Sequence, residues 1–225
     1  MTLSKRVDAI VSHQLGRWQA EPHPERPRPC VALSRLPGSG ASAIGHRVAE
    51  RLGYGFFGSE IVDQIAAERG IARNLLHGLD EHVRSAIDRF VTDAFRERGL
   101  SESDYLRDVV RIVSTLGRRG GAVILGRGAV FILPPEQALR VLLVAPRGAR
   151  VERVAKDRGL GRDAAAAWVD REDAWRREFV RHHFGLRDDD PTFYDLIINT
   201  LTLSTEVAAE TVVDVLRRRF GARAR

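Results

Sequence analysis

The stretch CVALSRLPGSGASAIGHRVAERLG, residues 30–53, decides the fold of this chain. It opens with the apolar run CVALS, which is short and continuous, as in strands that are buried on both faces of a parallel sheet. The run enters a loop with two glycines, and Ile44, Val48 and Leu52 then recur at the spacing of a helix with one apolar face. A strand, a glycine loop and a helix in this order are typical of a phosphate-binding turn.

The glycine loop, SRLPGSGAS at residues 34–42, has the backbone chemistry of such a turn. Gly38 and Gly40 permit a bend that brings successive amide N–H groups close to an anion. The full motif G-x-x-x-x-G-K-[ST] is not met, because Arg35 stands at its first glycine and Ala41 at its lysine. Ser42 keeps the hydroxyl that the motif offers to Mg²⁺. The same pattern also fits a tight turn without a ligand, so the loop alone leaves both interpretations open.

The rest of the chain continues the alternation of strands and helices. The apolar runs predict further strands at residues 54–57, 122–126, 140–144 and 194–200. Apolar residues at helical spacing predict helices over residues 83–94, 106–116, 162–184 and 207–216, another from about 149, and one that Ser59 caps. This order favours an α/β three-layer sandwich on a parallel sheet, with the ligand at the carboxyl ends of the strands.

The N-terminal segment reads as an arm attached to this domain. Residues 3–18 can form a helix with one apolar face, and EPHPERPRP at residues 21–29 has four prolines, which predict a stiff, extended connector. We therefore expect an arm over residues 1–29 and one α/β domain over residues 30–225. The arm could dock on that domain or on a second subunit, which leaves a homodimer open.

Composition sets the class of protein. The chain has 225 residues, 44% of them hydrophobic, which suffices for one substantial core. Its formal net charge of +6 favours anionic partners without choosing among them. Cys30 is the only cysteine, which excludes an intrachain disulfide. No signal peptide and no apolar run of about 20 residues is evident, so we expect a reduced, cytoplasmic protein without a membrane partner.

Arg127 is a candidate ligand-binding residue. The segment VILGRGAVFIL, residues 123–133, delivers this arginine between two glycines at the end of a buried strand. A cation there is costly unless it faces a ligand or a counter-charge. The alternative is a structural ion pair between Arg127 and a carboxylate.

A charged helix provides further candidates. In DREDAWRREFVRHHFG, residues 170–185, helical spacing puts Asp173, Arg176, Arg177 and Arg181 near one face. Such a face can close over phosphate groups, neutralise them and exclude water. It can equally be an ordinary solvated surface.

Together these segments resemble the cytidylate kinase-like family, relatives of the P-loop nucleoside monophosphate kinases. The resemblance covers roughly residues 30–218 and also draws on RVLLVAPRGARVERVAKDRGL at 140–160 and DPTFYDLIINT at 190–200. It implies a five-stranded parallel sheet with a phosphate loop, a helical acceptor-binding insertion and an arginine lid.

The resemblance also implies roles for individual residues. The phosphates of ATP would lie against Gly38, Ser39, Gly40, Ala41 and Ser42. Ser59 and Arg127 match positions near the acceptor. Arg171, Asp173 and Arg176 fall on the lid motif, where arginines surround the transferring phosphoryl group.

Three departures from the family pattern bear on activity. Ala41 replaces the loop lysine, and Gly58 and Gly128 replace two aspartates. Phosphoryl transfer depends mostly on positioning and charge, so another cation can serve. Arg35 is the nearest in sequence and the one we favour, and Arg127 or Arg176 are the alternatives.

Two interpretations of function follow. The chain is expected to transfer phosphoryl from ATP, with Mg²⁺, to a nucleoside monophosphate or another small phosphate acceptor. The alternative is a nucleotide-binding regulatory module without turnover. The basic end RRRFGARAR, residues 217–225, carries no recognition motif, so no specific nucleic-acid partner is expected.

Overall fold

The computed structural model describes residues 27–67, 81–97 and 103–224. The predicted arm helix of residues 3–18 and most of the proline connector lie outside the described residues. The division of the chain at residue 30 therefore stays a prediction.

Strands and helices alternate through the described chain. Two short 3₁₀ turns, Pro191–Phe193 and Gly221–Ala224, add to the following elements: β1 Cys30–Arg35, α2 Ala41–Leu52, β2 Gly55–Phe57, α3 Ser59–Ala67, α5 Glu81–Glu97, α6 Asp104–Arg119, β3 Ala122–Leu125, α7 Ala129–Ile132, β4 Ala138–Val144, α8 Arg147–Arg158, α9 Arg162–Phe184, β5 Leu196–Asn199 and α10 Thr205–Phe220.

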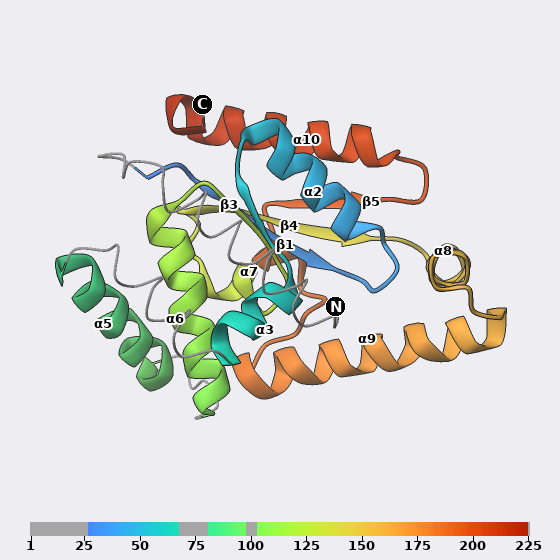
Figure 1. Ribbon diagram of the computed structural model, residues 1–225, viewed down its shortest axis with the longest axis horizontal. Helices are drawn as coiled ribbons and strands as arrows, with labels where there is room; N and C mark the ends of the chain where they lie inside the picture. The colour runs from blue at the N-terminus through green and yellow to red at the C-terminus, as the bar shows by residue number, and fades with distance from the viewer. Residues whose placement is uncertain (1–26, 68–80, 98–102, 225) are drawn as a thin grey trace, which may run out of the picture.

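The strands form one five-stranded sheet in the order β2-β3-β1-β4-β5, and every pairing is parallel. Helices cover both of its faces, with α2 and α10 on one and α3, α6 and α7 on the other (Figure 1). This confirms the predicted three-layer sandwich. Because β1 is the central strand, the glycine loop that follows it lies in the middle of the sheet's carboxyl edge.

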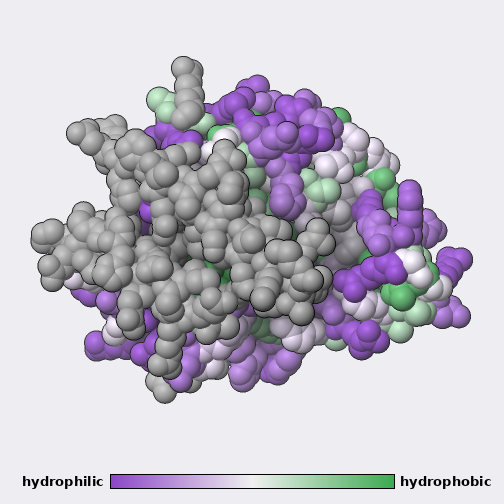
Figure 2. All heavy atoms as spheres, in the orientation of Figure 1, coloured by the Kyte–Doolittle hydropathy of each residue, from purple (hydrophilic) through white to green (hydrophobic). Residues whose placement is uncertain are grey.

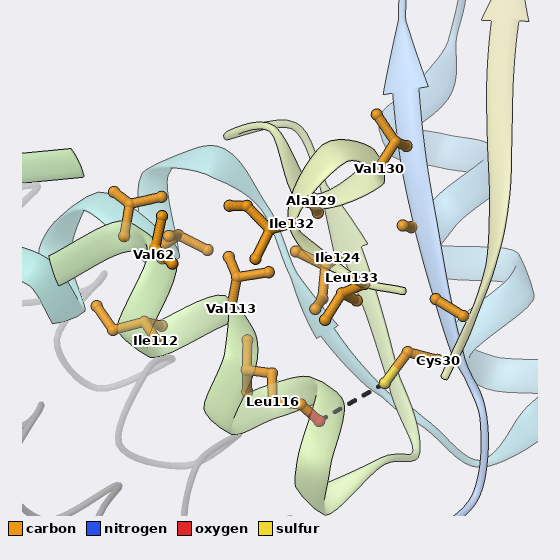
Figure 3. Packing of buried hydrophobic residues seen from close by; sticks show 14 of the residues in the cluster. Cys30, Val62, Ile112, Val113, Leu116, Ile124, Ala129, Val130, Ile132 and Leu133 are labelled. Atoms are coloured by element: carbon orange, nitrogen blue, oxygen red, sulfur yellow. Dashed lines mark hydrogen bonds between the residues drawn. The ribbon is translucent and has the colours of Figure 1, made fainter. Parts of the chain in front are cut away.

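Alternate residues of β1 join two separate apolar cores. Cys30 and Ala32 face the core under α6, whereas Val31 and Leu33 face the core under α2 and α10. In the first core the Cys30 thiol donates to the Leu116 carbonyl at 3.6 Å (Figure 3), and burial raises the pKa of that thiol to about 12. The cysteine is therefore a small packing residue rather than a nucleophile.

The outer surface of α2 and α10 is polar. Hydrophilic side chains gather over these helices (Figure 2), where Arg47 and Arg51 on α2 contact Glu206 on α10. Within the described chain, every helix is too short or too polar to cross a bilayer.

Two local predictions differ from the structure, and one short helix was not predicted. Helix α3 begins at Ser59 itself, and the amide of Val62 donates to the carbonyl of Gly58, so Gly58 rather than Ser59 stands at the N-cap. Helix α8 begins at Arg147, directly after Pro146, and not near residue 149. The sequence also missed α7, because four apolar residues are too few to show a helical period.

Candidate active site

A cavity of about 990 Å³ opens at the carboxyl edge of the sheet. Its walls come from the end of β1 and the glycine loop, the starts of α2 and α3, the β3–α7 turn, the end of α8 and the middle of α9. The glycine loop, the segment around Arg127 and the charged helix were predicted from sequence to bind a ligand. They meet at the edge where ligands bind in parallel α/β sheets.

The carbonyl groups of the glycine loop are bound from outside the cavity. Arg150 Nη1 donates to the Pro37 carbonyl at 3.0 Å, and Arg153 Nη1 donates to the Gly38 carbonyl at 2.8 Å. The hydroxyl of Thr200 donates to the Ser39 carbonyl at 2.8 Å. In a trans peptide the N–H of the next residue points the opposite way. The carbonyls of Pro37 and Ser39 therefore turn the amides of Gly38 and Gly40 toward the cavity that they line.

The two loop glycines have different reasons for being glycine. Both have a φ of 80°, a conformation that other residues rarely adopt. At Gly38 a Cβ would also lie 2.9 Å from the Arg150 carbonyl oxygen, so α8 packs too close for any side chain. Near Gly40 the closest atom is the flexible end of Arg153. The turn at Gly38 thus depends on tertiary packing as well as on backbone freedom.

The first turn of α2 adds further hydrogen-bond donors. Its first amides, at Ala41, Ser42 and Ala43, precede the helical ladder and have no intrahelical acceptor. Ser39 is 1% exposed, and its hydroxyl has no hydrogen-bond partner among the described residues. Ala41 places a buried methyl group at the position of the missing lysine. An anion could therefore bind amide and hydroxyl groups of the loop, but the loop carries no positive charge of its own.

Arg35 brings a charge into the same cavity. It is the last residue of β1, and its Nη1 would lie 2.9 Å from a Cβ at Gly126, so the guanidinium packs against the end of β3. Among the described residues, the guanidinium of Arg35 makes no hydrogen bond or ion pair, although its backbone pairs with Leu143 in the sheet. Burial lowers its pKa, Glu60 opposes that shift, and Arg127 reinforces it. Since guanidinium stays protonated in proteins, Arg35 is a partly buried charge on the cavity wall, attracted by Glu60 and Glu172 but without a direct ion pair among the described residues.

Arg127 is held in a defined orientation. With a φ of 49° it is the only non-glycine residue of the described chain at positive φ. Its Nε donates to Asp63 Oδ1 at 2.6 Å and its Nη2 to Asp63 Oδ2, and the Tyr105 hydroxyl donates to Oδ1 at 2.8 Å. Burial opposes the charge of Arg127, but the Asp63 hydrogen bond raises its pKa. The structural pair considered from sequence therefore exists, and Nη1 is left for a ligand.

Burial and the Asp63 hydrogen bond both raise the pKa of Tyr105. The phenol therefore stays protonated and continues to donate to Asp63 at neutral pH. The backbone of Arg127, unusual for a residue with a side chain, lies between Gly126 and Gly128 and is stabilised by this chain of contacts.

Gly128 stands where the resemblance predicts an aspartate, and its surroundings exclude a side chain. Its φ is 70°, and a Cβ built on it would overlap the ring of Phe184 at the end of α9. An aspartate cannot fit at position 128 while Phe184 of α9 packs against the β3–α7 turn in this way.

The lid candidates on α9 divide into two groups. Arg176 lines the cavity, donates to Ser34 Oγ at 2.8 Å and pairs with Asp188. Asp173 instead pairs with Arg150 through two hydrogen bonds of 3.0 and 2.8 Å, with both side chains mostly buried. Arg171 is exposed. Neither Arg171 nor Asp173 is among the described residues that line the cavity.

The structure thus brings most of the sequence-derived candidates to one place. The cavity is lined by Arg35, Gly38, Ser39, Gly40, Ala41, Ser42, Ser59, Arg127 and Arg176. Sequence reasoning missed the neighbours that orient them, namely Asp63, Tyr105, Arg150, Arg153 and Thr200. Asp63 could have been found, because it follows Ser59 by one helical turn, whereas the others had no local signal.

Comparisons with known proteins agree with this geometry. A model of the cytidylate kinase-like family matches residues 30–202. A cytidylate kinase of Aeropyrum pernix is 30% identical over 192 residues, which cover 83% of this chain and 98% of that protein. One of Pyrococcus horikoshii is 28% identical over 177 residues, covering 78% of this chain and 82% of that protein.

A solved structure shares the fold. It is an uncharacterized protein of Eubacterium ventriosum, with a TM-score of 0.67 at 18% identity, covering 85% of this chain and 99% of that chain. Because the family model spans most of this chain, and its segments build the cavity, the chain belongs to the cytidylate kinase-like family.

Proposed function

We propose that this protein transfers the terminal phosphoryl group of ATP to a small phosphate acceptor, first of all a nucleoside monophosphate such as cytidylate. The observation that carries the proposal is the guanidinium of Arg35, which lines the cavity without a direct ion pair among the described residues, beside the loop amides of Gly38 and Gly40. A partly buried cation in this position favours the binding of an anion. The relatives named cytidylate kinase support the acceptor class.

On the donor side, the amides of Gly38 and Gly40 and of the first turn of α2 would hold the phosphates of ATP. Arg35 would contribute the charge that the family's lysine contributes elsewhere. A guanidinium can bind two phosphate oxygens at once, which suits this role.

A magnesium ion fits this site. Ser42 offers a hydroxyl on the cavity wall, and the carboxylates of Glu60 and Glu172 line the same cavity. Mg²⁺ usually binds through few protein oxygens plus substrate phosphates, so these side chains are sufficient in number. When bound, the ion would neutralise charge on the phosphate oxygens.

On the acceptor side, Arg127 and Ser59 line the cavity. Arg127 follows the end of β3, and Ser59 follows the end of β2. Asp63 fixes the guanidinium of Arg127 and leaves Nη1 for an acceptor oxygen. Arg176 reaches the end of β1 from α9 and would stabilise the phosphoryl group in transfer. The role of Arg171 and Asp173 in catalysis stays a prediction from the resemblance.

A nucleotide-binding module without turnover is the second candidate. The observation that favours it is Gly128, where the Phe184 ring excludes the acid that the family pattern places there. This interpretation retains ATP binding and predicts no acceptor-dependent ADP release.

The decisive experiment is a coupled assay of ADP release with ATP, Mg²⁺ and a panel of nucleoside monophosphates, beside Arg127→Ala. Acceptor-dependent turnover that the variant loses supports the kinase. A rise in melting temperature with ATP, but no turnover with any acceptor, supports the regulatory module. Neither turnover nor a thermal shift would contradict both.

We expect Asp63→Asn to raise the KM for the acceptor about tenfold, because Arg127 loses its charged partner and its fixed orientation. The thermal shift produced by ATP should stay at the wild-type value. Asp195→Asn is the matched control, since Asp195 pairs with Arg140 and Arg219 and does not line the cavity. An equal rise in KM for both variants would show that Asp63 acts only through general stability.

A further inference from the structure

Trp175 is the most exposed large hydrophobic side chain of the described residues. It is 53% exposed and lies on α9, where it lines the cavity. Aromatic side chains normally bury much of their large apolar area. An indole that stays open on a cavity wall is therefore a contact surface for a ligand.

The indole of Trp175 is already held in position. It stacks on Phe179, one helical turn further along α9, with ring centroids 5.3 Å apart and 26° between the planes. Phe179 is packed in turn against Phe184 and His183. A ring fixed in this way loses little conformational freedom when another ring stacks on it.

Trp168 provides an internal comparison on the same helix. It also lines the cavity, but Arg158 lies over its ring with Cζ 4.1 Å from the centroid. That cation already occupies a stacking face of Trp168. Arg127 also lies over the ring of Trp175, but its Cζ is 5.3 Å from the centroid, and Trp175 keeps about half of its surface open.

The position of Trp175 connects it to the acceptor rather than to ATP. Arg127, at the end of β3, lies next to the indole and has Nη1 free of Asp63. Trp168, in contrast, contacts α8, the helix that packs against the glycine loop through Arg150 and Arg153. An acceptor that binds Arg127 would thus present its remaining atoms to Trp175.

We propose that Trp175 is the platform on which the planar ring of the acceptor stacks, so that this side chain selects nucleotides over phosphate acceptors without a base. The inference rests on the proposed function, which assigns the ATP site and the acceptor site. It concerns only binding of the acceptor, so it can be tested without turnover. Trp175 on α9 and Arg127 at the end of β3 would then contact the same acceptor molecule.

The test uses a chain in which Trp175 is the sole tryptophan. The protein has three tryptophans, so Trp18→Phe with Trp168→Phe leaves only this reporter. Its fluorescence is titrated with CMP, UMP, AMP, ribose 5-phosphate and ATP, each alone. We expect a nucleoside monophosphate to quench the emission, and ribose 5-phosphate and ATP to leave it unchanged at matched concentrations. Quenching by ATP alone, or by no nucleoside monophosphate, overturns the proposal.

A second measurement gives the size of the effect. In the otherwise native chain, Trp175→Ala should weaken binding of the quenching nucleotide about tenfold to a hundredfold, the usual range for one base stacked on one aromatic ring. Trp175→Tyr keeps a ring and should retain most of the affinity, and Trp168→Ala is the matched control. Unchanged affinity in Trp175→Ala would refute the proposal.

The two proposals fail in different ways. Quenching and the affinity loss without any ADP release would leave Trp175 as a base platform and reject the kinase. Acceptor-dependent ADP release that Trp175→Ala does not alter would leave the kinase and reject the platform.

Discussion

Replacing Arg35 by methionine should abolish the rise in melting temperature that ATP produces, and should lower turnover about 10²–10³-fold, the usual cost of removing one donor that stabilises the transferring charge. The reason is that the glycine loop itself carries no cation, since Ala41 occupies the lysine position. In the absence of nucleotide the same variant should melt at an equal or higher temperature than wild type. Its partly buried guanidinium has no direct ion pair within the described chain, so methionine removes a charge that Glu60 and Glu172 offset only through space.

Two further variants are compared with Arg35→Met: one keeps the positive charge at position 35, and the other removes an arginine elsewhere on the surface. Arg35→Lys keeps a cation and should restore part of the ATP response. Arg187→Ala removes an arginine that is 82% exposed and pairs with Asp189, and it should behave as wild type. If Arg35→Met keeps the full thermal shift with ATP, Arg35 has no part in binding the donor.

The largest loss of stability should come from Arg150→Ala. The pair of Arg150 and Asp173 is only 6% and 14% exposed, and the guanidinium also donates to the carbonyls of Pro37 and Ala145. Removing it strands a nearly buried carboxylate, which typically costs about 3–5 kcal/mol. Because the Pro37 carbonyl loses its donor, the turn of the glycine loop should loosen too, and the ATP response should shrink with it.

The matched control is a second pair between the same two helices. Arg147 and Asp170 also form a two-point ion pair between α8 and α9, but they are 54% and 55% exposed. Water screens such a pair, so Arg147→Ala should lower the free energy of unfolding far less than Arg150→Ala does. Urea unfolding of both variants measures the difference in the free energy of unfolding. Equal losses would mean that burial of the Arg150–Asp173 pair does not matter to stability.

The position of the site was largely predictable from local patterns. An apolar run such as CVALS can only be buried on both faces, and a glycine loop that follows it must lie at the carboxyl edge of the sheet. Arg35 and Arg127 end such runs, so their arrival at one cavity follows from the parallel topology. Helix α9 also kept its predicted bounds at Arg162–Phe184.

The partners of those residues were not predictable in the same way. Helical spacing put Asp173 and Arg176 near one face, yet Asp173 turns to Arg150 whereas Arg176 reaches Ser34. Spacing defines a side of a helix, but it does not say which of two neighbouring elements lies closest to each residue on that side. That depends on how α8 and α9 cross the edge of the sheet.

The sequence by itself determined the order of the strands and of the longer helices, the glycines of the loop and the absence of its lysine, because each of these depends on residues that are neighbours in the chain. Only the tertiary structure decided that Thr200 binds the Ser39 carbonyl across 161 positions and that Asp63 orients Arg127 across 64. A hydrogen bond between distant segments forms where packing brings a donor within about 3 Å of an acceptor, and no local pattern records that distance.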